Sequence, residues 1–476
     1  MNEPSNKEVV SGITKSDLPV SIESGQSLYS KHEKVYPREV HGLFAALRVT
    51  GVFVLLGLYY IIPWLEWEGT QLVLFDLPNR KFHIFGIIFW PQDFFYLALL
   101  LIIAALSLFF FTALAGRLWC GYACPQTVWT EVFLWIERKV EGDRPRQMKL
   151  DKAPWTFDKL KIKATKHFIW VIFSLYTGLT FVGYFSPLRE LAANAYSLNL
   201  GPWEWFWIIF YSVATYGNAG WLREQVCTYM CPYARFQSAM IDSDTLIISY
   251  DTARGESRGK RKKGEDPKNQ GLGDCIDCTI CVQVCPTGID IRDGLQYDCI
   301  GCAACIDACD DVMEKVGYEK GLIRYTTENI LNGSTAHFIR PRIVVYGIIL
   351  LVIIVSTFYA ISQREPLAMD VLRDRNSLYR ETNEGWIENV YIIKVMNMEN
   401  ITRRYHLTVS GIEGLTIDMD RPEVEVPAGS VIEIPVRAKV NPDNLDKPSS
   451  AIQFKLQADH QQDLNISEEA RFIGPR

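Results

Sequence analysis

Cysteine is missing from both ends of this 476-residue chain, because all twelve cysteines lie between Cys120 and Cys309. The C-terminal part therefore cannot hold the disulfide that is typical of immunoglobulin domains. Histidine is scarce: the seven histidines are scattered, and no C-x2-C-H run is present for covalent haem. The first forty residues have no early apolar segment, which indicates a polar tail over residues 1–40 rather than a secretory signal.

Eight of the cysteines form two runs with the spacing C-x2-C-x2-C-x3-C. This is the bacterial ferredoxin run, in which three cysteines bind one 4Fe-4S cluster and the fourth binds the other cluster. Structural zinc sites are disfavoured, because a third cysteine follows at the same short spacing in both runs. The predicted ligands are Cys275, Cys278, Cys281 and Cys309 for one cluster, and Cys285, Cys299, Cys302 and Cys305 for the other.

The other four cysteines form two C-x3-C-P motifs, Cys120 to Pro125 and Cys227 to Pro232. Proline suits the first turn of a helix, so we expect helices over 126–140 and 233–241. Cys124 and Cys231 would then lie at helix N-termini, where the backbone dipole lowers the pKa of a thiol.

Arginines close before each motif, Arg117 and Arg223, favour the thiolate in the same way. Four converging thiolates could bind Cu(I), hold a third iron-sulfur cluster, or cycle between dithiol and disulfide. The sequence alone does not decide among these three possibilities.

Five apolar stretches are long enough to cross a bilayer as helices of about 20 residues. They run roughly from Phe44 to Leu65, Phe94 to Ala115, His167 to Ser186, Trp203 to Gly220 and Ile343 to Ile361. The fourth contains Asn218 and two glycines, and an interfacial or broken helix is the alternative there.

Positive charge is concentrated between the second and third stretches, which places that loop, the N-terminus and residues 242–340 on the cytoplasmic side. The cysteine distribution agrees, since all twelve fall in segments assigned to the reducing side. The basic run from Lys260 to Lys263 fits a loop beside an anionic inner leaflet better than a nucleic-acid site.

Beyond the fifth stretch, apolar and polar residues alternate in short segments such as 390–395 and 452–456, which predicts an antiparallel sandwich. We therefore predict a multi-domain integral membrane protein. Its parts are a tail (1–40), a four-span α-helical domain (41–241), a ferredoxin-like domain with two 4Fe-4S clusters (242–340), a fifth span (341–362) and a periplasmic immunoglobulin-like all-β domain (363–476).

Four features together resemble the CcoG family, also called FixG or RdxA, of cytochrome c oxidase accessory proteins. They are the segment 116–126 (GRLWCGYACPQ), the second C-x3-C-P motif, the doubled ferredoxin run, and Arg364-Glu-Pro-Leu367 followed by 371–375. The resemblance extends from about Tyr36 to the C-terminus. The residue after Cys309 is Asp310 rather than proline, which is the one departure in the cysteine motifs.

This resemblance implies a multi-pass protein of the bacterial inner membrane that acts in the biogenesis of cbb3-type oxidase by reducing Cu(II) to Cu(I). The eight ferredoxin positions would bind clusters, and Cys120, Cys124, Cys227 and Cys231 would handle copper, as substrate or transient ligand. The expected partners are membrane lipid, a cytoplasmic electron donor, and oxidase subunits or copper chaperones, with no nucleic acid. The oligomeric state stays open, with a homodimer as one option.

Two other functions fit the same residues. One is a quinol-linked electron-transfer subunit similar to the NapH group, with electrons taken from the bilayer quinone pool. The other is a copper chaperone or assembly scaffold without catalysis, in which the clusters are structural and the sandwich binds an oxidase subunit.

Overall fold

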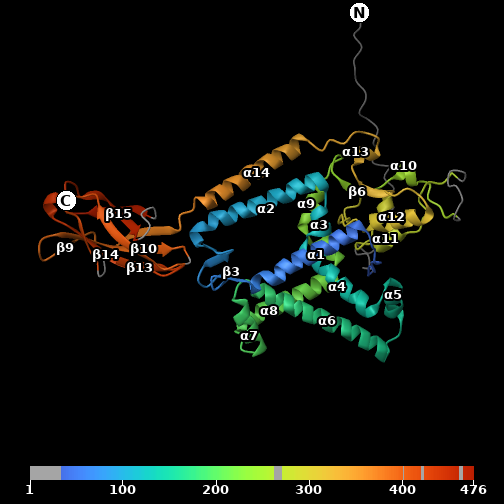
Figure 1. Cartoon of the computed structure of the whole chain (residues 1–476), viewed down its shortest axis with the longest axis horizontal. Coiled ribbons are helices and arrows are strands. Elements are labelled where there is room, and N and C mark those ends of the chain that lie inside the picture. Colours follow the sequence, from blue (N-terminus) through green and yellow to red (C-terminus); the bar gives the residue numbers. More distant parts are fainter. Residues whose placement is uncertain (1–33, 262–270, 400, 420–422, 460–464, 476) are drawn as a thin grey trace, which may run out of the picture.

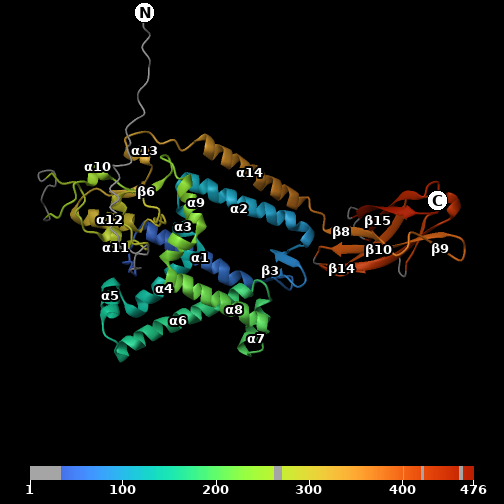
Figure 2. The same cartoon turned by 180° about the vertical axis from the view of Figure 1, so that it is seen from behind.

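The computed structural model describes residues 34–261, 271–399, 401–419, 423–459 and 465–475. Most of the expected tail (1–33) and part of the basic run (Lys262 and Lys263) lie outside these ranges. The described chain is elongated, with the ferredoxin-like part at one end, the sandwich at the other and long helices between them (Figure 1). The view from behind shows the same order (Figure 2).

Three helical segments among the described residues are long and apolar enough to cross a membrane: 43–64, 91–115 and 341–362. They contain α1 (Leu43–Ile61), α2 (Phe94–Ala115) and α14 (Pro341–Ser362), together with the short 3-10 helices η1 (Ile62–Trp64) and η2 (Pro91–Asp93). α2 and α14 lie side by side, and the Tyr96 hydroxyl donates to the carbonyl of Ala360 at 3.1 Å (Figure 1). These helices correspond to the first, second and fifth expected spans.

The third and fourth expected spans form α6 (Phe157–Val182) and α8 (Pro202–Thr215). The two helices pack together, with the ring centroids of Phe181 and Tyr211 3.9 Å apart. Among the described residues, neither of these two helices combines the length and the apolar composition that the other three have. The five expected spans therefore remain a prediction. α8 continues as the π-helix η3 (Tyr216–Leu222), which accounts for the irregularity expected in this stretch.

Shorter elements connect these helices. At the end of the helices away from the ferredoxin-like part are β1 (Glu66–Trp67), β2 (Thr70–Gln71), β3 (Val73–Asp76), β4 (Lys81–Ile84), β5 (Ile87–Phe89) and α7 (Leu188–Tyr196). Toward the ferredoxin-like part are α3 (Leu118–Tyr122), α4 (Pro125–Glu141), α5 (Arg144–Lys152), the π-helix η4 (Val226–Met230) and α9 (Pro232–Met240). α4 and α9 confirm the helices expected after the two C-x3-C-P motifs.

Buried ion pairs hold α4 against α6 and η3. The Glu137 carboxylate is 2.6 Å from the guanidinium of Arg223, and the Glu141 carboxylate is 2.8 Å from Nζ of Lys166. All four side chains are buried. Arg223 is therefore fixed in position just before the second C-x3-C-P motif.

The ferredoxin-like part is built on one two-stranded antiparallel sheet, in which β6 pairs with β7. Its elements are β6 (Ile247–Tyr250), α10 (Thr252–Gly255), α11 (Ile280–Val284), η6 (Ile291–Asp293), α12 (Ala304–Val316), β7 (Ile323–Thr326) and α13 (Glu328–Leu331). The buried Asp307 of α12 caps α1 from outside, because its carboxylate accepts hydrogen bonds from the amides of Phe44 at 3.2 Å and Ala45 at 2.7 Å.

The C-terminal part is a sandwich of two antiparallel sheets, ordered β12-β14-β10-β8 (with β9 beside β10) and β13-β11-β15-β16. Its core contains the fully buried rings of Tyr391 and Phe454, which meet edge to face. The strands are β8 (Leu367–Arg373), β9 (Arg380–Glu381), β10 (Ile387–Asn397), β11 (Arg403–Ser410), β12 (Thr416–Asp418), β13 (Glu423–Val426), β14 (Val431–Val440), β15 (Ser449–Ala458) and β16 (Asn465–Ile473).

Side-chain contacts, as well as the continuous backbone, connect the sandwich to the helices. Arg364, between α14 and β8, forms a 2.5 Å ion pair with Asp93 at the start of α2 and donates to the carbonyl of Ile88 at 2.8 Å. Arg364 therefore connects the junction of α14 and the sandwich to the start of α2.

Candidate metal centres

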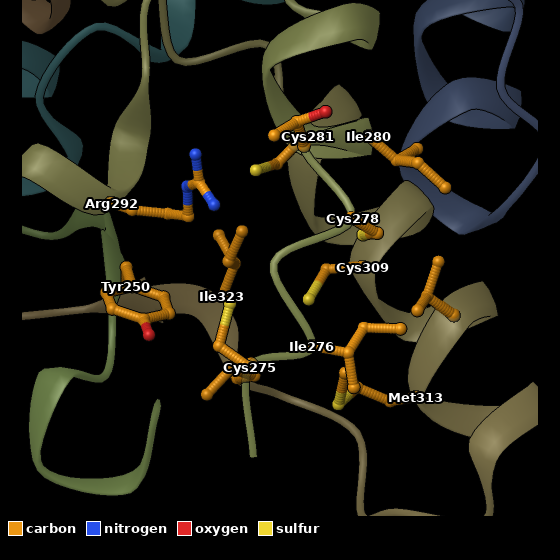
Figure 3. A pocket seen from close by; sticks show the side chains of 13 residues that line it. Tyr250, Cys275, Ile276, Cys278, Ile280, Cys281, Arg292, Cys309, Met313 and Ile323 are labelled. Atoms are coloured by element: carbon orange, nitrogen blue, oxygen red, sulfur yellow. The ribbon is translucent and has the colours of Figure 1, made fainter. Parts of the chain in front are cut away.

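Four cysteines surround one cavity in the ferredoxin-like part: Cys275, Cys278, Cys281 and Cys309. Figure 3 shows them with Tyr250 and Arg292 on the wall of the same cavity. The rest of the lining is mostly apolar, including Ile276 and Ile323. These are the four cysteines predicted for the first cluster.

A second cavity is lined by Cys285, Cys299, Cys302 and Cys305, with Cys281 at the side shared with the first. α12 contributes to both, since Cys305 faces the second cavity and Cys309 the first. The structure thus gathers the cysteines in the crossed arrangement that the spacing predicts.

The two runs also share an unusual backbone. Asp277 and Thr279 have positive φ of 54° and 57°, and the equivalent Gly301 and Ala303 have 69° and 58°. Left-handed residues in such turns form concave arrays of backbone N–H groups, which bind anionic groups including iron-sulfur clusters. Four thiols and such a turn at each cavity fit two 4Fe-4S clusters.

Asp310 in place of proline has a structural reason. In the first run α11 ends at Val284, so Pro286 follows a helix that has already stopped. In the second run α12 continues from Ala304 to Val316, and proline at position 310 would interrupt it. Asp310 instead accepts a hydrogen bond from the amide of Gly321 at 2.8 Å.

Burial controls the protonation of these thiols when no metal is bound. It raises the pKa of Cys281, Cys302 and Cys309 to about 12. Since cluster ligands are thiolates, iron has to displace these protons when it binds. Among the described residues no group of three or more His, Cys, Asp or Glu side chains is placed to hold a single metal ion.

The four remaining cysteines meet at the edge of the helical part. Cys120 lies on α3 and Cys227 on η4, whereas Cys124 and Cys231 are the N-cap residues of α4 and α9. All four are partly buried and free of disulfides. They are close enough for thiolate charge on the other three to raise the pKa of Cys120.

The prediction that the helix N-terminus lowers the pKa of Cys124 is wrong. Burial is the largest influence and raises it, although the backbone N–H groups of Thr127 and Gln126 act in the opposite direction. Burial also raises the pKa of Cys120 to about 12 and that of Cys227 to about 11. Desolvation of a thiolate at these positions outweighs the helix dipole.

The two arginines before the motifs act differently from one another. Arg117 favours the thiolate of Cys120, as predicted. Arg223 instead pairs with Glu137, so its charge is already compensated.

The sequence interpretation missed Gln237 on α9. The thiol of Cys120 donates a hydrogen bond to Oε1 of Gln237 at 3.0 Å. Nε2 of Gln237 in turn donates to the hydroxyl of Tyr233 at 3.0 Å and to the hydroxyl of Thr112 at 3.3 Å. Gln237 is fully buried. A glutamine on a helix carries no local signal for such a role.

The helix that bears Cys120, α3, lies directly against the loop that holds the second cavity. A Cβ atom on Gly121 would be 2.7 Å from the carbonyl oxygen of Gly301 and 2.9 Å from Cα of Cys302, so only glycine allows α3 to approach this closely. Arg117 donates to the carbonyl of Cys299 at 3.4 Å, and Arg48 of α1 donates to that of Cys302. The thiol set and the second cluster site are therefore adjacent.

Comparisons with known proteins agree with this division of the chain. Residues 222–328 match a family described as a 4Fe-4S dicluster domain, residues 97–141 match a 4Fe-4S binding domain, and residues 357–475 match the IG-like fold at the C-terminus of FixG.

Three bacterial relatives are similar over most of their length. The chain is 37% identical to nitrogen fixation protein FixG of Rhizobium meliloti (88% of this chain, 86% of the relative). It is 41% identical to protein RdxB and 40% identical to protein RdxA of Cereibacter sphaeroides, over 83% and 87% of this chain and 85% and 88% of the relatives.

Proposed function

Because this chain belongs to the family of FixG, RdxA and RdxB, we propose that its iron-sulfur redox function is the reduction of Cu(II) to Cu(I) for the biogenesis of cbb3-type oxidase. The protein acts in the inner membrane, with the ferredoxin-like part in the cytoplasm and the sandwich in the periplasm. Copper is the substrate, and oxidase subunits or copper chaperones receive the product.

One observation carries the proposal: α3, which bears Cys120, packs on the backbone of Gly301 and Cys302. Electron transfer slows steeply with distance, so direct contact of these segments supports an electron path from the second cluster site to the thiols. The clusters, when bound, supply one-electron carriers.

The chain's own residues then determine what happens to copper. Soft thiolate ligands favour Cu(I) over Cu(II), so binding at the four cysteines stabilises the reduced product. The four thiols are free of disulfides and only partly buried, which suits a cargo that has to leave again. Gln237 holds the proton of Cys120 until metal displaces it.

The test is copper reduction by the anaerobically purified protein, whose clusters are first reduced with dithionite and separated from excess dithionite before Cu(II) is added, with a Cu(I)-specific chelator as reporter. Serine at all four of Cys120, Cys124, Cys227 and Cys231 should abolish reduction and leave the optical and paramagnetic signals of both clusters intact. Tyr229→Phe, an exposed change within the second motif, is the matched control. Full activity of the four-serine variant would refute the assignment.

The same preparation tests a third cluster at these cysteines, which the 4Fe-4S match over 97–141 favours. Two 4Fe-4S clusters require about eight irons per chain, and the four-serine variant should keep them. About twelve irons that fall to eight in the variant would establish a third cluster in place of a copper site.

A further inference from the structure

A large cavity lies between α1, α4 and the ferredoxin-like part. Its volume is about 930 Å³, which lies in the range of small-molecule sites, about 300–1,000 Å³. It shares part of its wall with the second cysteine-lined cavity and none with the first. The function proposed above does not use it.

The wall formed by α1 is apolar and reaches into the membrane-spanning part of the helix. It includes Val52, Leu56 and Gly57, and it extends to Tyr60. Val49 and Phe53 also line the cavity, and they are 46% and 75% exposed. The cavity is therefore open sideways toward the position of the bilayer, so an apolar molecule can enter from the lipid.

The opposite end reaches both redox sites. Cys302 and Ile300, which line the second cluster cavity, also line this one, and so does Cys227. Arg48, on the same wall, donates to the carbonyl of Cys302. A ring bound at this end would lie against the loop that holds the second cluster.

Polar groups line the cavity along the length of α4. Thr127 and Thr130 line the cavity together with Arg138, whose guanidinium is 2.9 Å from Glu131. The hydroxyls of Thr127 and Thr130 and the guanidinium of Arg138 are the groups along this wall that suit the oxygen atoms of a polar ring.

We propose that this cavity binds a membrane quinol, which is the electron donor of the protein. Its ring lies between Arg138 and Cys302, and its isoprenoid tail follows α1 toward the exposed Val49 and Phe53. A cytoplasmic donor was expected from the sequence, but the cavity opens toward lipid. The inference rests on the proposed function only for the final destination of the electrons.

Quinol oxidation in this cavity needs acceptors for two electrons and two protons. Oxidation of one quinol to quinone releases two electrons and two protons and breaks the two O–H bonds. The electrons leave past Cys302, one to each of the two clusters, which explains why a two-electron donor is served by two one-electron sites. The protons pass to the carboxylates at the cytoplasmic end, Glu131 and then the exposed Glu39, and from there to water.

Gly57 allows the cavity to be filled without disturbing the fold. A Cβ atom there would meet no heavy atom within 4 Å, so Gly57→Phe projects its ring into the cavity. Leu58→Phe is the matched control, because Leu58 is the next residue of the same helix, 53% exposed and absent from the cavity wall. Thr130→Leu narrows the cavity from α4 and serves as the second variant if Gly57→Phe does not fold.

Binding is measured with decylubiquinone on the full chain in phospholipid nanodiscs, by quenching of tryptophan fluorescence, for which Trp135 in the cavity wall is a reporter. The expected result is saturable quenching with wild type and Leu58→Phe, and at least a tenfold weaker affinity in Gly57→Phe. If the wild-type protein does not bind decylubiquinone, for example because phospholipid fills the cavity, the proposal is overturned.

The second readout is reduction of the clusters by decylubiquinol, followed optically under anaerobic conditions. Gly57→Phe should lose it, while dithionite still drives copper reduction in that variant at the wild-type rate. Quinol reduction at the wild-type rate in Gly57→Phe would also overturn the proposal. If quinol reduces the clusters but no copper is reduced with either reductant, the copper function fails and the quinol site stands.

Discussion

Individual charges in this protein are set by burial more than by helix ends. Cys120, Cys124 and Cys227 show this, since burial raises the pKa of all three thiols although Cys124 caps a helix. Glu137 shows the opposite result for a carboxylate: desolvation alone would raise its pKa, but Arg223, Lys34 and Lys166 together lower it to about 2. What decides each case is whether an opposite charge is within reach.

Replacement of Glu137 by glutamine should destabilise the helical part by about 3 kcal/mol or more, because it leaves the buried guanidinium of Arg223 without its ion-pair partner. The pKa in the folded protein is below the ordinary 4.5, so this stabilisation is complete above pH 4.5 and is lost as the pH falls toward 2. The thermal unfolding midpoint at neutral pH and at about pH 4 measures both effects. Glu433→Gln, in an exposed pair with Lys394, is the control, and an equal loss in both variants would contradict the prediction.

Copper binding by the membrane-edge thiols should strengthen as the pH rises. Cys120 and Cys227, with pKa values of about 12 and 11, are protonated near neutral pH, and the metal has to displace those protons. Each displaced proton makes the affinity rise up to about tenfold per pH unit below those pKa values. Competition titrations of Cu(I) against a chelator between about pH 6.5 and 8.5 measure the slope, and an affinity independent of pH would argue against thiol ligands.

At the scale of elements, local signals were predictable and distant contacts were not. The ferredoxin spacing indicated both sets of four cysteines, and Pro125 and Pro232 indicated the starts of α4 and α9, because each signal lies within a few residues. Gln237 accepts a hydrogen bond from the thiol of Cys120, which is 117 residues away in the sequence. No sequence period or motif marks such a distant pair.

The approach of α3 to the loop at Gly301 is the element contact on which the proposed electron path depends. Gly121→Ala should push the two apart, because the obstructing atoms are backbone and cannot move aside cheaply. We expect the iron content to stay at the wild-type level while the rate of dithionite-driven copper reduction falls at least tenfold.

Gly217→Ala is the control for this change, since a Cβ atom at Gly217 would meet nothing within 4 Å. An unchanged rate in Gly121→Ala with normal iron content would show that electrons reach the thiols by another route.

The whole molecule places its redox sites and its sandwich at opposite ends of the long helices (Figure 1). Alternating strands made the sandwich predictable, because a buried face requires a period of two. The number of spans was harder to predict, since α6 begins as a charged helix with Lys159, Lys161 and Lys163 before its apolar part, and α8 ends in a π-helix. Composition alone does not show where such helices lie relative to lipid.

A chain that ends after Ser362 tests the scaffold alternative. It lacks the sandwich, which has its own core and contacts the helices through Arg364 and Asp93, far from the thiols. We expect this truncated protein to reduce copper in detergent at the full-length rate. Loss of copper reduction with normal iron content would favour the scaffold alternative, in which the sandwich is essential.

The cap that Asp307 provides for α1 sets an order on how the protein is made. The amides of Phe44 and Ala45 are separated from their acceptor by 263 and 262 residues. The first hydrophobic helix therefore leaves the ribosome long before its capping carboxylate has been translated, and that carboxylate sits on α12 between Cys305 and Cys309. The start of α1 can therefore receive its cap only after α12 has been synthesised and folded.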